Sequence, residues 1–540
     1  MIKFIIRIFL LSGILLCPPP LPAAEPFDLP QFIQKELSAG KKTITIPPGR
    51  YRVTPQGKEH VRLSGLRDVT IEATGVELVC TETTRAVTVL NCTNLIIRGL
   101  SIDYDPLPFT QGRITSVSED RRVYEVELFD GYPPPEKIIT PKYEVFEPDG
   151  IAFRHDEYAP FQVEPASGRT LRLIKSRVLK TGGQVGDIII FDTEDALGGS
   201  HPHAVYIENS KEIRFEKVVL YASNCFGFLE VGCDRTVYQD CAVRRRRPES
   251  DPVRRGHFRV RSLNADAFHS KAALHGPQII GCSAEYQADD AVNITGSYHL
   301  ISGTEDGRLT VLAHRIMDIQ AGDRVELVDR NGRSLPDAKV VSIRRDGPTS
   351  PEEIKLVQSL PILQSVRDLL KQRYIVELDR SVSVEPGAII CSRDRVGDHF
   401  KIINCHFSRN RSRGILVKAS GGEIRDTVIE HCGMTAFLIA PSYEWLEAGF
   451  VHGLTVENCT VTDSGGPAVE IHGIGKFLGH SRLNFSRNLF ITDAIPAVSI
   501  DAVESAVFEQ NTLNGQPLPE SSLAVKIRNS ESVLIKPENR

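Results

Sequence analysis

The sequence has few of the features that mark nucleic-acid-binding, disordered or membrane-spanning proteins. Its 540 residues include 64 Lys and Arg against 69 Asp and Glu, so neither sign of charge dominates. It has 1 Trp, 3 Met and no low-complexity tract. Beyond the N-terminus, no segment approaches the ~20 apolar residues of a membrane span. We therefore expect an elongated repeat or several domains, with no nucleic-acid partner and no membrane-spanning segment.

The long apolar run is at the N-terminus, in MIKFIIRIFLLSGILLCPPPLPAAEP. Basic residues precede an apolar stretch that is followed by small residues, a pattern typical of a secretory signal peptide, which we expect to be cleaved near Ala24. Cys17 raises a lipoprotein as the alternative, but Leu16 before it fits a lipoprotein cleavage site poorly. We predict a secreted or periplasmic protein.

The cysteines recur in one context, which argues against the disulfide framework that an exported protein can carry. The recurring positions are Cys92, Cys241, Cys282, Cys405, Cys432 and Cys459. Small apolar thiols stacked in a core explain such a pattern, whereas disulfides are the alternative. We expect free, buried cysteines.

The cysteine context is an internal repeat. Cys405, Cys432 and Cys459 are 27 residues apart, and the series continues at Asn488 and Asn511. Short strands at a period of about 20 to 30 residues, without intervening helices, are typical of a β-solenoid. The chain lacks the Leu pattern of leucine-rich repeats and the four strands per ~40 residues of a propeller. We predict an all-β fold, a right-handed parallel β-helix.

Other segments complete the domain organisation. Residues 28–40 look like an amphipathic helix that closes the open end of the solenoid. Residues 111–197 and 301–395 break the repeat with alternating apolar and polar residues, as barrel-like insertions on solenoid loops do, and the second carries a predicted helix over 361–372. The predicted domains are a signal peptide (1–24), an N-terminal cap with the first coils (25–110), an inserted β-module (111–197), β-helix coils (198–300), a second inserted β-module (301–395) and C-terminal coils (396–540).

Three aspartates are spaced so that a solenoid would bring them together. Asp266 lies in SLNADAFHS, and Asp289-Asp290 begins 23 residues later in CSAEYQADDAVNIT. Because this spacing is about one coil, we expect Asp266 on the neighbouring coil, roughly 5 Å away. If the pair lies where a strand turns, both of its side chains can face the outer groove. Three carboxyls this close cannot all ionise normally, so at least one pKa should rise.

Such a cluster suits glycoside hydrolysis. In that reaction one carboxyl donates a proton to the leaving oxygen, while another activates water or attacks carbon. An Asp ladder at a turn and a cation site are the structural alternatives. The combination of Asn264-Ala-Asp266 with an Asp-Asp pair one coil later favours catalysis.

The segment NADAFHSKAALHGPQIIGCSAEYQADDAVNITGSY resembles the active-site segment of glycoside hydrolase family 110, exo-acting α-1,3-galactosidases. LSIDYDPLPFTQGRI, NRSRGILVKASGG and YEWLEAGF resemble further segments of that family, so the resemblance covers nearly all the mature chain, with patchy identities. It implies a parallel β-helix with two β-barrel insertions, and an inverting hydrolysis that needs no metal or other cofactor. Where the family pattern continues Asn-Val-His-Gly, this chain has Asn293-Ile-Thr-Gly296, which puts galactose specificity in doubt.

The resemblance also implies roles for the three aspartates, which would be the catalytic acids. The wider group of polygalacturonase-like β-helix enzymes has a similar Asn-x-Asp and Asp-Asp layout, in which the first residue of the pair is the acid. By that analogy, Asp289 is the general acid, and Asp266 with Asp290 is the base.

Further residues near the cluster are candidate ligands for a sugar. Arg413 and Lys418 follow an Asn-Arg turn after the pair, and Trp445, beside Glu447, offers an aromatic ring for a sugar face. Solvated turn charges and a rim or core Trp are the structural alternatives. The predicted substrate-binding residues are Asn264, His269, Asn293, Arg413, Lys418, Trp445 and Glu447.

Eight arginines are concentrated between Arg244 and Arg261, in RRRRPESDPVRRGHFRVR. A solvated loop explains them, and the alternative is a subsite for a sulfated or uronic-acid glycan, since Arg pairs bidentately with such anions. The expected partner is an oligo- or polysaccharide, and a homo-oligomer stays open. Two other functions also stay open: a β-helix hydrolase, lyase or epimerase acting on an anionic polysaccharide, and a non-catalytic glycan-binding β-helix.

Overall fold

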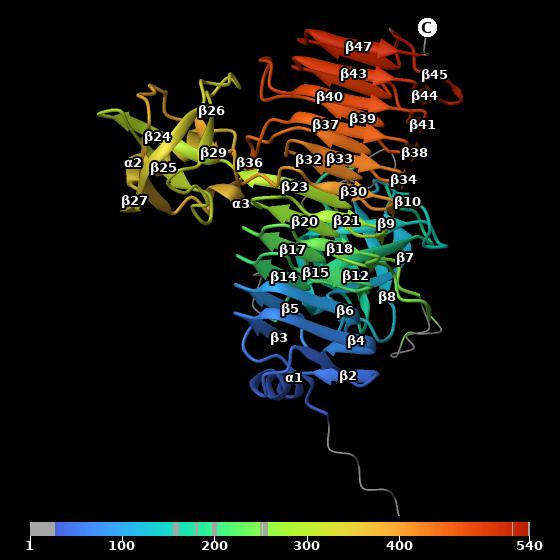
Figure 1. The fold of residues 1–540 in the computed structure, drawn as a ribbon. Helices are drawn as coiled ribbons and strands as arrows, with labels where there is room; N and C mark the ends of the chain where they lie inside the picture. Colours follow the sequence, from blue (N-terminus) through green and yellow to red (C-terminus); the bar gives the residue numbers. More distant parts are fainter. Residues whose placement is uncertain are drawn as a thin grey trace, which may run out of the picture.

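The computed structural model describes residues 27–154, 161–178, 182–196, 202–248, 251, 258–520 and 522–537. The predicted signal peptide, including Cys17, lies outside these residues. Figure 1 shows a rod of stacked coils with two additional units attached along its length. Within the described residues, no helix is both long enough and apolar enough to cross a membrane.

The rod is a parallel β-helix. A typical coil contains β18 (Val237–Gln239), β19 (Ala242–Val243) and β20 (Phe268–Lys271), and each strand pairs in parallel with its counterpart in the next coil. The first two strands of a coil belong to one large sheet, and the third belongs to a second sheet. The core lies between the sheets and is filled by Ile, Val, Leu, Phe and Cys side chains.

The other strands of the large sheet are β1 (Thr43–Thr45), β2 (Gly49–Val53), β4 (Arg67–Cys80), β6 (Thr93–Tyr104), β15 (Arg214–Glu216), β16 (Val219–Leu220), β21 (Gln278–Ile280), β22 (Ser283–Glu285), β30 (Lys401–Ile403), β31 (His406–Ser408), β33 (Gly422–Arg425), β34 (Val428–Glu430), β37 (His452–Glu457), β38 (Thr460–Thr462), β40 (Ser481–Ser486), β41 (Leu489–Ile491), β43 (Ser505–Glu509), β44 (Thr512–Leu513), β45 (Gln516–Pro517) and β47 (Ser532–Lys536). The other strands of the second sheet are β3 (Glu59–Ser64), β5 (Arg85–Leu90), β14 (Val205–Glu208), β17 (Phe228–Val231), β23 (Val292–Ser297), β32 (Ile415–Val417), β35 (Phe437–Ile439), β39 (Val469–Ile471), β42 (Val498–Asp501), β46 (Val525–Arg528) and β36 (Glu447–Ala448), which is antiparallel to β23.

The repeated cysteine context marks bends between strands. Four of its cysteines lie between the first two strands of a coil (Cys241, Cys282, Cys405 and Cys459), whereas Cys92 follows β5 and Cys432 follows β34. At the bend after β30, Asn404 adopts a left-handed conformation with φ of 55°, which Asn tolerates better than most residues. The next residue, Cys405, points into the core, and its thiol donates a hydrogen bond to the carbonyl oxygen of Ile279 on the preceding coil at 3.3 Å. The cysteines of the described residues are free, and those of the recurring context are buried, so the prediction of core thiols is confirmed.

The N-terminal end of the rod is covered by α1 (Leu29–Ser38), which lies within the segment 28–40 where the sequence predicts a capping helix. Asp28 accepts a hydrogen bond from the backbone N–H of Gln31 and thereby caps this helix. Leu29 and Ile33 are buried against the first coils. The helix therefore covers apolar groups that the first coil would otherwise expose.

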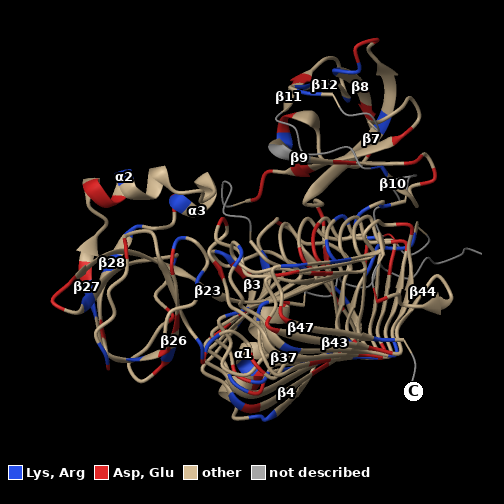
Figure 2. Ribbon diagram, turned by 90° about the horizontal axis from the view of Figure 1, so that it is seen from above, with Lys and Arg blue, Asp and Glu red and all other residues tan. Residues whose placement is uncertain are grey.

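Two antiparallel units interrupt the β-helix. Module I is a single sheet with the strand order β10-β9-β13-β7-β8-β12-β11, and module II is a closed barrel with the order β24-β25-β28-β27-β26-β29. In Figure 2 the two modules project from different sides of the rod. Module I contains β7 (Phe109–Val117), β8 (Val123–Leu128), the 3₁₀-helix η1 (Pro135–Lys137), β9 (Ile138–Phe146), β10 (Phe153–Arg154), β11 (Phe161–Pro165), β12 (Thr170–Lys175) and β13 (Ile188–Thr193). Module II contains β24 (His299–Glu305), β25 (Arg308–Ala313), β26 (Arg324–Val328), β27 (Ala338–Pro348), α2 (Pro351–Ser359), α3 (Gln364–Arg367), β28 (Gln372–Leu378) and β29 (Ile389–Ser392).

The helix predicted over 361–372 is wrong in extent, because only α3 is helical there. The longer helix of module II is α2, which begins with a capping box: the Ser350 hydroxyl accepts from the N–H of Glu353, and the Glu353 carboxylate accepts from the N–H of Ser350. The apolar residues of the predicted segment, such as Ile362 and Val366, pack instead into the core of module II.

Candidate active site

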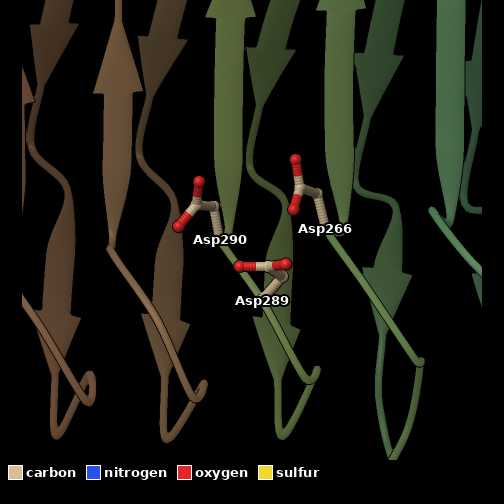
Figure 3. A group of neighbouring side chains, drawn as sticks. All are labelled: Asp266, Asp289 and Asp290. Carbon is tan, nitrogen blue, oxygen red and sulfur yellow. The ribbon is translucent and has the colours of Figure 1, made fainter. Parts of the chain in front are cut away.

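The three aspartates lie at one corner of the β-helix, in the turns that lead into β20 and β23 (Figure 3). We refer to Asp266, Asp289 and Asp290 as the aspartate cluster. Their closest carboxylate oxygens lie within 4.8 Å of one another. The N–H of Ala267 donates to the carbonyl oxygen of Asp290 at 3.1 Å, so Asp266 is level with Asp290 rather than with Asp289.

The turn explains how two consecutive carboxyls share one side of the molecule. Strand β22 ends before Tyr286, which has a left-handed φ of 56°, and β23 begins only at Val292. The pair is therefore outside the strands, where neighbouring side chains need not point to opposite faces. The Asp289 side chain is 29% exposed, whereas that of Asp290 is 3% exposed, so Asp289 is the member of the pair that a substrate can reach.

Two arginines of the next coil support the pair. Both Nε and the backbone N–H of Arg413 donate to Oδ1 of Asp290, each at 2.9 Å. Nη2 of Arg411 donates to Oδ1 of Asp289 at 3.1 Å. Burial raises the pKa of Asp290 to about 6, with Arg413 opposing this shift and the other two aspartates adding to it. The predicted upward shift therefore falls on Asp290, which remains mostly ionised at pH 7.

His269, on β20, contacts both Asp266 of the aspartate cluster and the ring of Phe226. Its Nδ1 is 2.8 Å from Oδ2 of Asp266, and its ring stacks on Phe226 with ring centroids 4.4 Å apart. Burial lowers the pKa of His269 to about 4, so the imidazole is neutral at pH 7. A neutral ring held in one orientation can position Asp266 or hydrogen-bond a sugar hydroxyl without adding charge.

A second polar group forms where the turn between β35 and β37 reaches β23. Strand β36 pairs with β23 and brings Glu447 to Lys418, whose Nζ lies 2.9 Å from Oε2 of Glu447 and donates to Oδ1 of Asn293 at 3.4 Å. Burial raises the pKa of Glu447, but the charge of Lys418 outweighs it and brings this pKa to about 2. Asn293 pairs in register with His269, so this group adjoins the aspartate cluster. Trp445, 51% exposed, is on the turn before β36.

Asn264 has a supporting position. Its Nδ2 donates to the carbonyl oxygen of Pro108 at 2.8 Å, and its Oδ1 accepts from Nη1 of Arg261 at 3.0 Å. Arg261 is fully buried and forms ion pairs with Glu144 and Asp192 of module I. These contacts brace the turn that carries Asp266, so we do not include Asn264 among the groups that contact a substrate.

Sequence reasoning missed Arg411, Phe226 and the bracing role of Arg261. A usable signal existed for Arg411, because the run Arg411-Ser-Arg413 occupies the turn of the coil that follows the Asp-Asp pair. Two guanidinium groups in that turn can each donate a hydrogen bond to one of the two adjacent carboxylates on the previous coil. Phe226 and Arg261 depend on contacts between turns and with module I, which no local pattern reveals.

The arginine cluster is not simply a solvated loop. Arg246 is buried and pairs with Glu77 and Asp103, and Arg259 is buried and pairs with Asp103 and Asp251. Five members of the cluster line a cavity, namely Arg244, Arg245, Arg246, Arg247 and Arg259. Arg254 and Arg255 lie outside the described residues.

Comparison with known proteins supports the fold and the family resemblance. Residues 387–535 match the family model described as "Right handed beta helix region". The chain is 23% identical to alpha-1,3-galactosidase B of Bacteroides thetaiotaomicron, over 89% of this chain and 83% of that protein. It is also 23% identical to alpha-1,3-galactosidase A of the same organism, over 90% of this chain and 85% of that protein. A solved structure of a polygalacturonase from Erwinia carotovora ssp. carotovora is similar at 10% identity and a TM-score of 0.39, covering 94% of this chain and 93% of that one.

These matches confirm the resemblance to the α-1,3-galactosidase family, which extends along about nine tenths of the chain. The architecture is a right-handed parallel β-helix.

Proposed function

We propose that the protein is an exported glycosidase that removes terminal α-linked galactose from an oligo- or polysaccharide, with inversion of configuration. The observation that carries this proposal is the aspartate cluster, in which two carboxyls are held by arginines at one corner of the β-helix. The similarity to α-1,3-galactosidases supports the choice of galactose.

In the proposed mechanism, Asp289 is the general acid, because its exposed carboxyl can reach the glycosidic oxygen. Asp266 and Asp290 together hold and activate the attacking water. A water that donates a hydrogen bond of ~2.8 Å to each of two carboxylates spans roughly 4.5 Å between their oxygens, which fits the separation within the cluster, at most 4.8 Å. The pKa of about 6 keeps Asp290 ionised at neutral pH and basic enough to accept a proton.

The separation of the carboxyls does not by itself predict inversion. Values of about 5–5.5 Å are typical of retaining glycosidases, and about 6.5–9.5 Å of inverting ones. We nevertheless propose inversion because Arg413 donates twice to one oxygen of Asp290, which makes this carboxylate a poor nucleophile. Two neighbouring buried carboxyls are also better suited to holding water. The configuration of the first product therefore decides this part of the mechanism.

The proposed sugar site lies beside the aspartate cluster. Lys418, Glu447 and Asn293 offer charged and amide groups that can bind hydroxyls, and His269 adds a neutral ring nitrogen. The exposed ring of Trp445 can stack on the apolar face of a sugar.

We propose that the reaction needs no metal. Three carboxylates could in principle ligate a divalent cation. However, Arg411 and Arg413 already place positive charge on Asp289 and Asp290, and a cation bound at the same oxygens would be repelled by these guanidinium groups.

The test uses the mature protein and Asp289→Asn on a panel of α- and β-linked nitrophenyl glycosides, α-1,3-galactobiose and sulfated galactans, with proton NMR of the products. Asp463→Asn, an exposed aspartate on another coil, is the matched control. We expect β-galactose to appear first. On α-1,3-galactobiose, kcat should be at least ~10³-fold lower in Asp289→Asn and unchanged in the control, whereas the loss on nitrophenyl glycosides should be much smaller, because nitrophenolate leaves without a proton.

Other products, or binding without turnover, would reject a specific part of this proposal. Release of α-galactose first would reject inversion while keeping hydrolysis. Unsaturated or oligomeric products would favour the β-helix enzymes of anionic polysaccharides, and binding without turnover would favour a glycan-binding protein. Export is proposed from the N-terminal segment, and a mature N-terminus other than near residue 25 in protein recovered from the periplasm or medium would reject the predicted cleavage.

A further inference from the structure

A cavity of about 470 Å³ lies where module I meets the β-helix. Its floor is formed by outward-facing residues of β22 and β31, and its wall by the segment that follows β19. None of the aspartate cluster lines it. Its lining residues are Arg244, Arg245, Arg246, Arg247, Pro248, Phe258, Arg259, Ser283, Ala284, Glu285, His406 and Ser408.

The charge of this cavity is positive. Behind the wall, Glu77, Asp103 and Asp251 neutralise Arg246 and Arg259. Toward the cavity, Arg244 and Arg245 form no ion pair with a carboxylate within the described part of the chain, and the single acidic lining residue is Glu285, since His406 pairs with Glu430, which does not line the cavity. The excess of cations over anions is what a site for an anionic ligand requires.

Arg244 and Arg245 are held by aromatic rings, and among the described residues neither forms an ion pair with a carboxylate. The guanidinium of Arg245 lies 3.4 Å from the ring centroid of Tyr286 and donates to the carbonyl oxygen of Gly150 at 2.8 Å. Nη2 of Arg244 donates to the hydroxyl of Tyr221 at 3.4 Å. Stacking fixes the guanidinium planes while leaving other N–H groups available, which is the arrangement suited to bidentate contact with a sulfate or carboxylate.

The rest of the lining suits a sugar. Ser283 and Ser408 present hydroxyls on neighbouring coils, and Phe258 presents an apolar ring against module I. The backbone of module I approaches this ring closely, because a Cβ on Gly150 would lie 2.6 Å from it. The cavity volume is within the ~300–1,000 Å³ typical of small-ligand sites, so it has room for a sugar unit together with its charged group.

We propose that this cavity is a second carbohydrate site, separate from the aspartate cluster, which binds a saccharide unit carrying a sulfate ester or a carboxylate. The anionic part of the ligand follows from the arginines alone, and the saccharide part rests on the proposed function. The site would hold an anionic part of a glycan while a terminal sugar is processed at the aspartate cluster.

The proposal is tested by calorimetric titration of the full mature chain with β-linked galactobiose, its monosulfated form, digalacturonate and inorganic sulfate. A β-linked probe is not a substrate of the proposed α-galactosidase, so turnover does not interfere. We expect at least one charged disaccharide to bind at least tenfold more tightly than both neutral galactobiose and inorganic sulfate. The preferred charged disaccharide distinguishes a sulfate from a carboxylate ligand.

Two variants connect binding to the cavity. Arg244→Gln/Arg247→Gln should weaken the charged disaccharide at least tenfold, whereas the matched pair Arg344→Gln/Arg380→Gln on module II should stay within twofold. Ser283→Trp keeps every arginine but fills the floor, so it should abolish disaccharide binding. Thermal unfolding of each variant within a few degrees of the wild type shows that the fold is intact.

The proposal is overturned if neutral and charged disaccharides bind alike, or if Arg244→Gln/Arg247→Gln binds as tightly as the wild type. Inorganic sulfate that binds as tightly as the sulfated disaccharide would reject the saccharide part. Hydrolysis of a nitrophenyl α-galactoside is measured on the same samples. Binding without hydrolysis rejects the proposed function alone, and hydrolysis without binding rejects the second site alone.

Discussion

Replacing Arg413 with methionine should shift the acidic limb of the pH–activity profile upward. Nε of Arg413 lies 2.9 Å from Oδ1 of Asp290, and two charges ~4 Å apart at an effective dielectric constant of ~20 attract by about 4 kcal/mol, or about 3 pKa units. The Arg413 side chain is 27% exposed and the backbone hydrogen bond remains, so we expect a rise of about 1–2 units. The pKa of Asp290 would thus move from about 6 to about 7–8.

The sign of the effect follows from the role of Asp290. A base must be ionised, so a higher pKa removes active enzyme at low pH. At pH 6 the ionised fraction of Asp290 should fall from about one half to about 1–10%, which lowers kcat/KM roughly 5- to 50-fold, and the loss should shrink toward pH 8. The assay is kcat/KM for a nitrophenyl α-galactoside between pH 4 and 9.

Arg411→Met is the matched control, because it removes a cation from Asp289 and leaves the Arg413–Asp290 pair intact. The acidic limb of this control should stay where it is in the wild type. An equal loss of activity at every pH in Arg413→Met, or the same limb in both variants, would show that ionisation of Asp290 does not limit the reaction.

Two further predictions concern charge. Lys418→Met leaves Glu447 without its buried partner and should lower the free energy of unfolding at pH 7 by about 3 kcal/mol in urea titrations, with Lys418→Met/Glu447→Gln recovering part of the loss. Since the pKa of Glu447 is lowered from 4.5 to about 2, the stabilisation is present above pH 4.5 and is lost as pH falls toward 2, so an undiminished difference between wild type and variant at low pH would refute this account. Treatment with EDTA should leave α-galactosidase activity unchanged, and activity lost on chelation and restored by a divalent cation would replace the arginine-supported mechanism with a metal site.

The β-helix was predictable because its coils repeat a local chemical requirement. The bend after β30 needs a residue that tolerates a positive φ and then a small side chain that fits the core, and Asn404-Cys405 satisfies both. In the last coils Asn488 and Asn511 take the cysteine position, and Nδ2 of Asn488 donates to Oδ1 of Asn511 at 2.9 Å. The 27-residue spacing of the cysteines, however, is only the average coil length. Cys405 and Cys459 occupy the same bend two coils apart with Thr427 between them, whereas Cys432 lies at the following bend, between β34 and β35.

The aspartate cluster was predictable for the same reason, but its surroundings were not. The spacing between Asp266 and the pair is about one coil, so stacking alone brings the carboxyls together. The position of Glu447 depends on β36, a short strand in the turn between β35 and β37. It pairs with β23 although about 150 residues, including module II and the strands β30 to β35, separate the two strands in the sequence. No sequence period predicts this pairing, so the contact between Lys418 and Glu447 becomes visible only in the fold.

The arginines between Arg244 and Arg261 explain why composition alone misleads. Arg261 joins the turn of Asp266 to two carboxylates of module I, so its charge is neutralised by ion pairs inside the protein. The charge of Arg259 is likewise neutralised inside the protein, by ion pairs with Asp103 and Asp251. Leaving a buried cation without its partners would cost several kcal/mol, so these arginines and their acids are expected to act as structural units. Module I is therefore joined to the turn that carries Asp266, and the cations that remain at the cavity are those whose positions are fixed by aromatic rings and a backbone carbonyl.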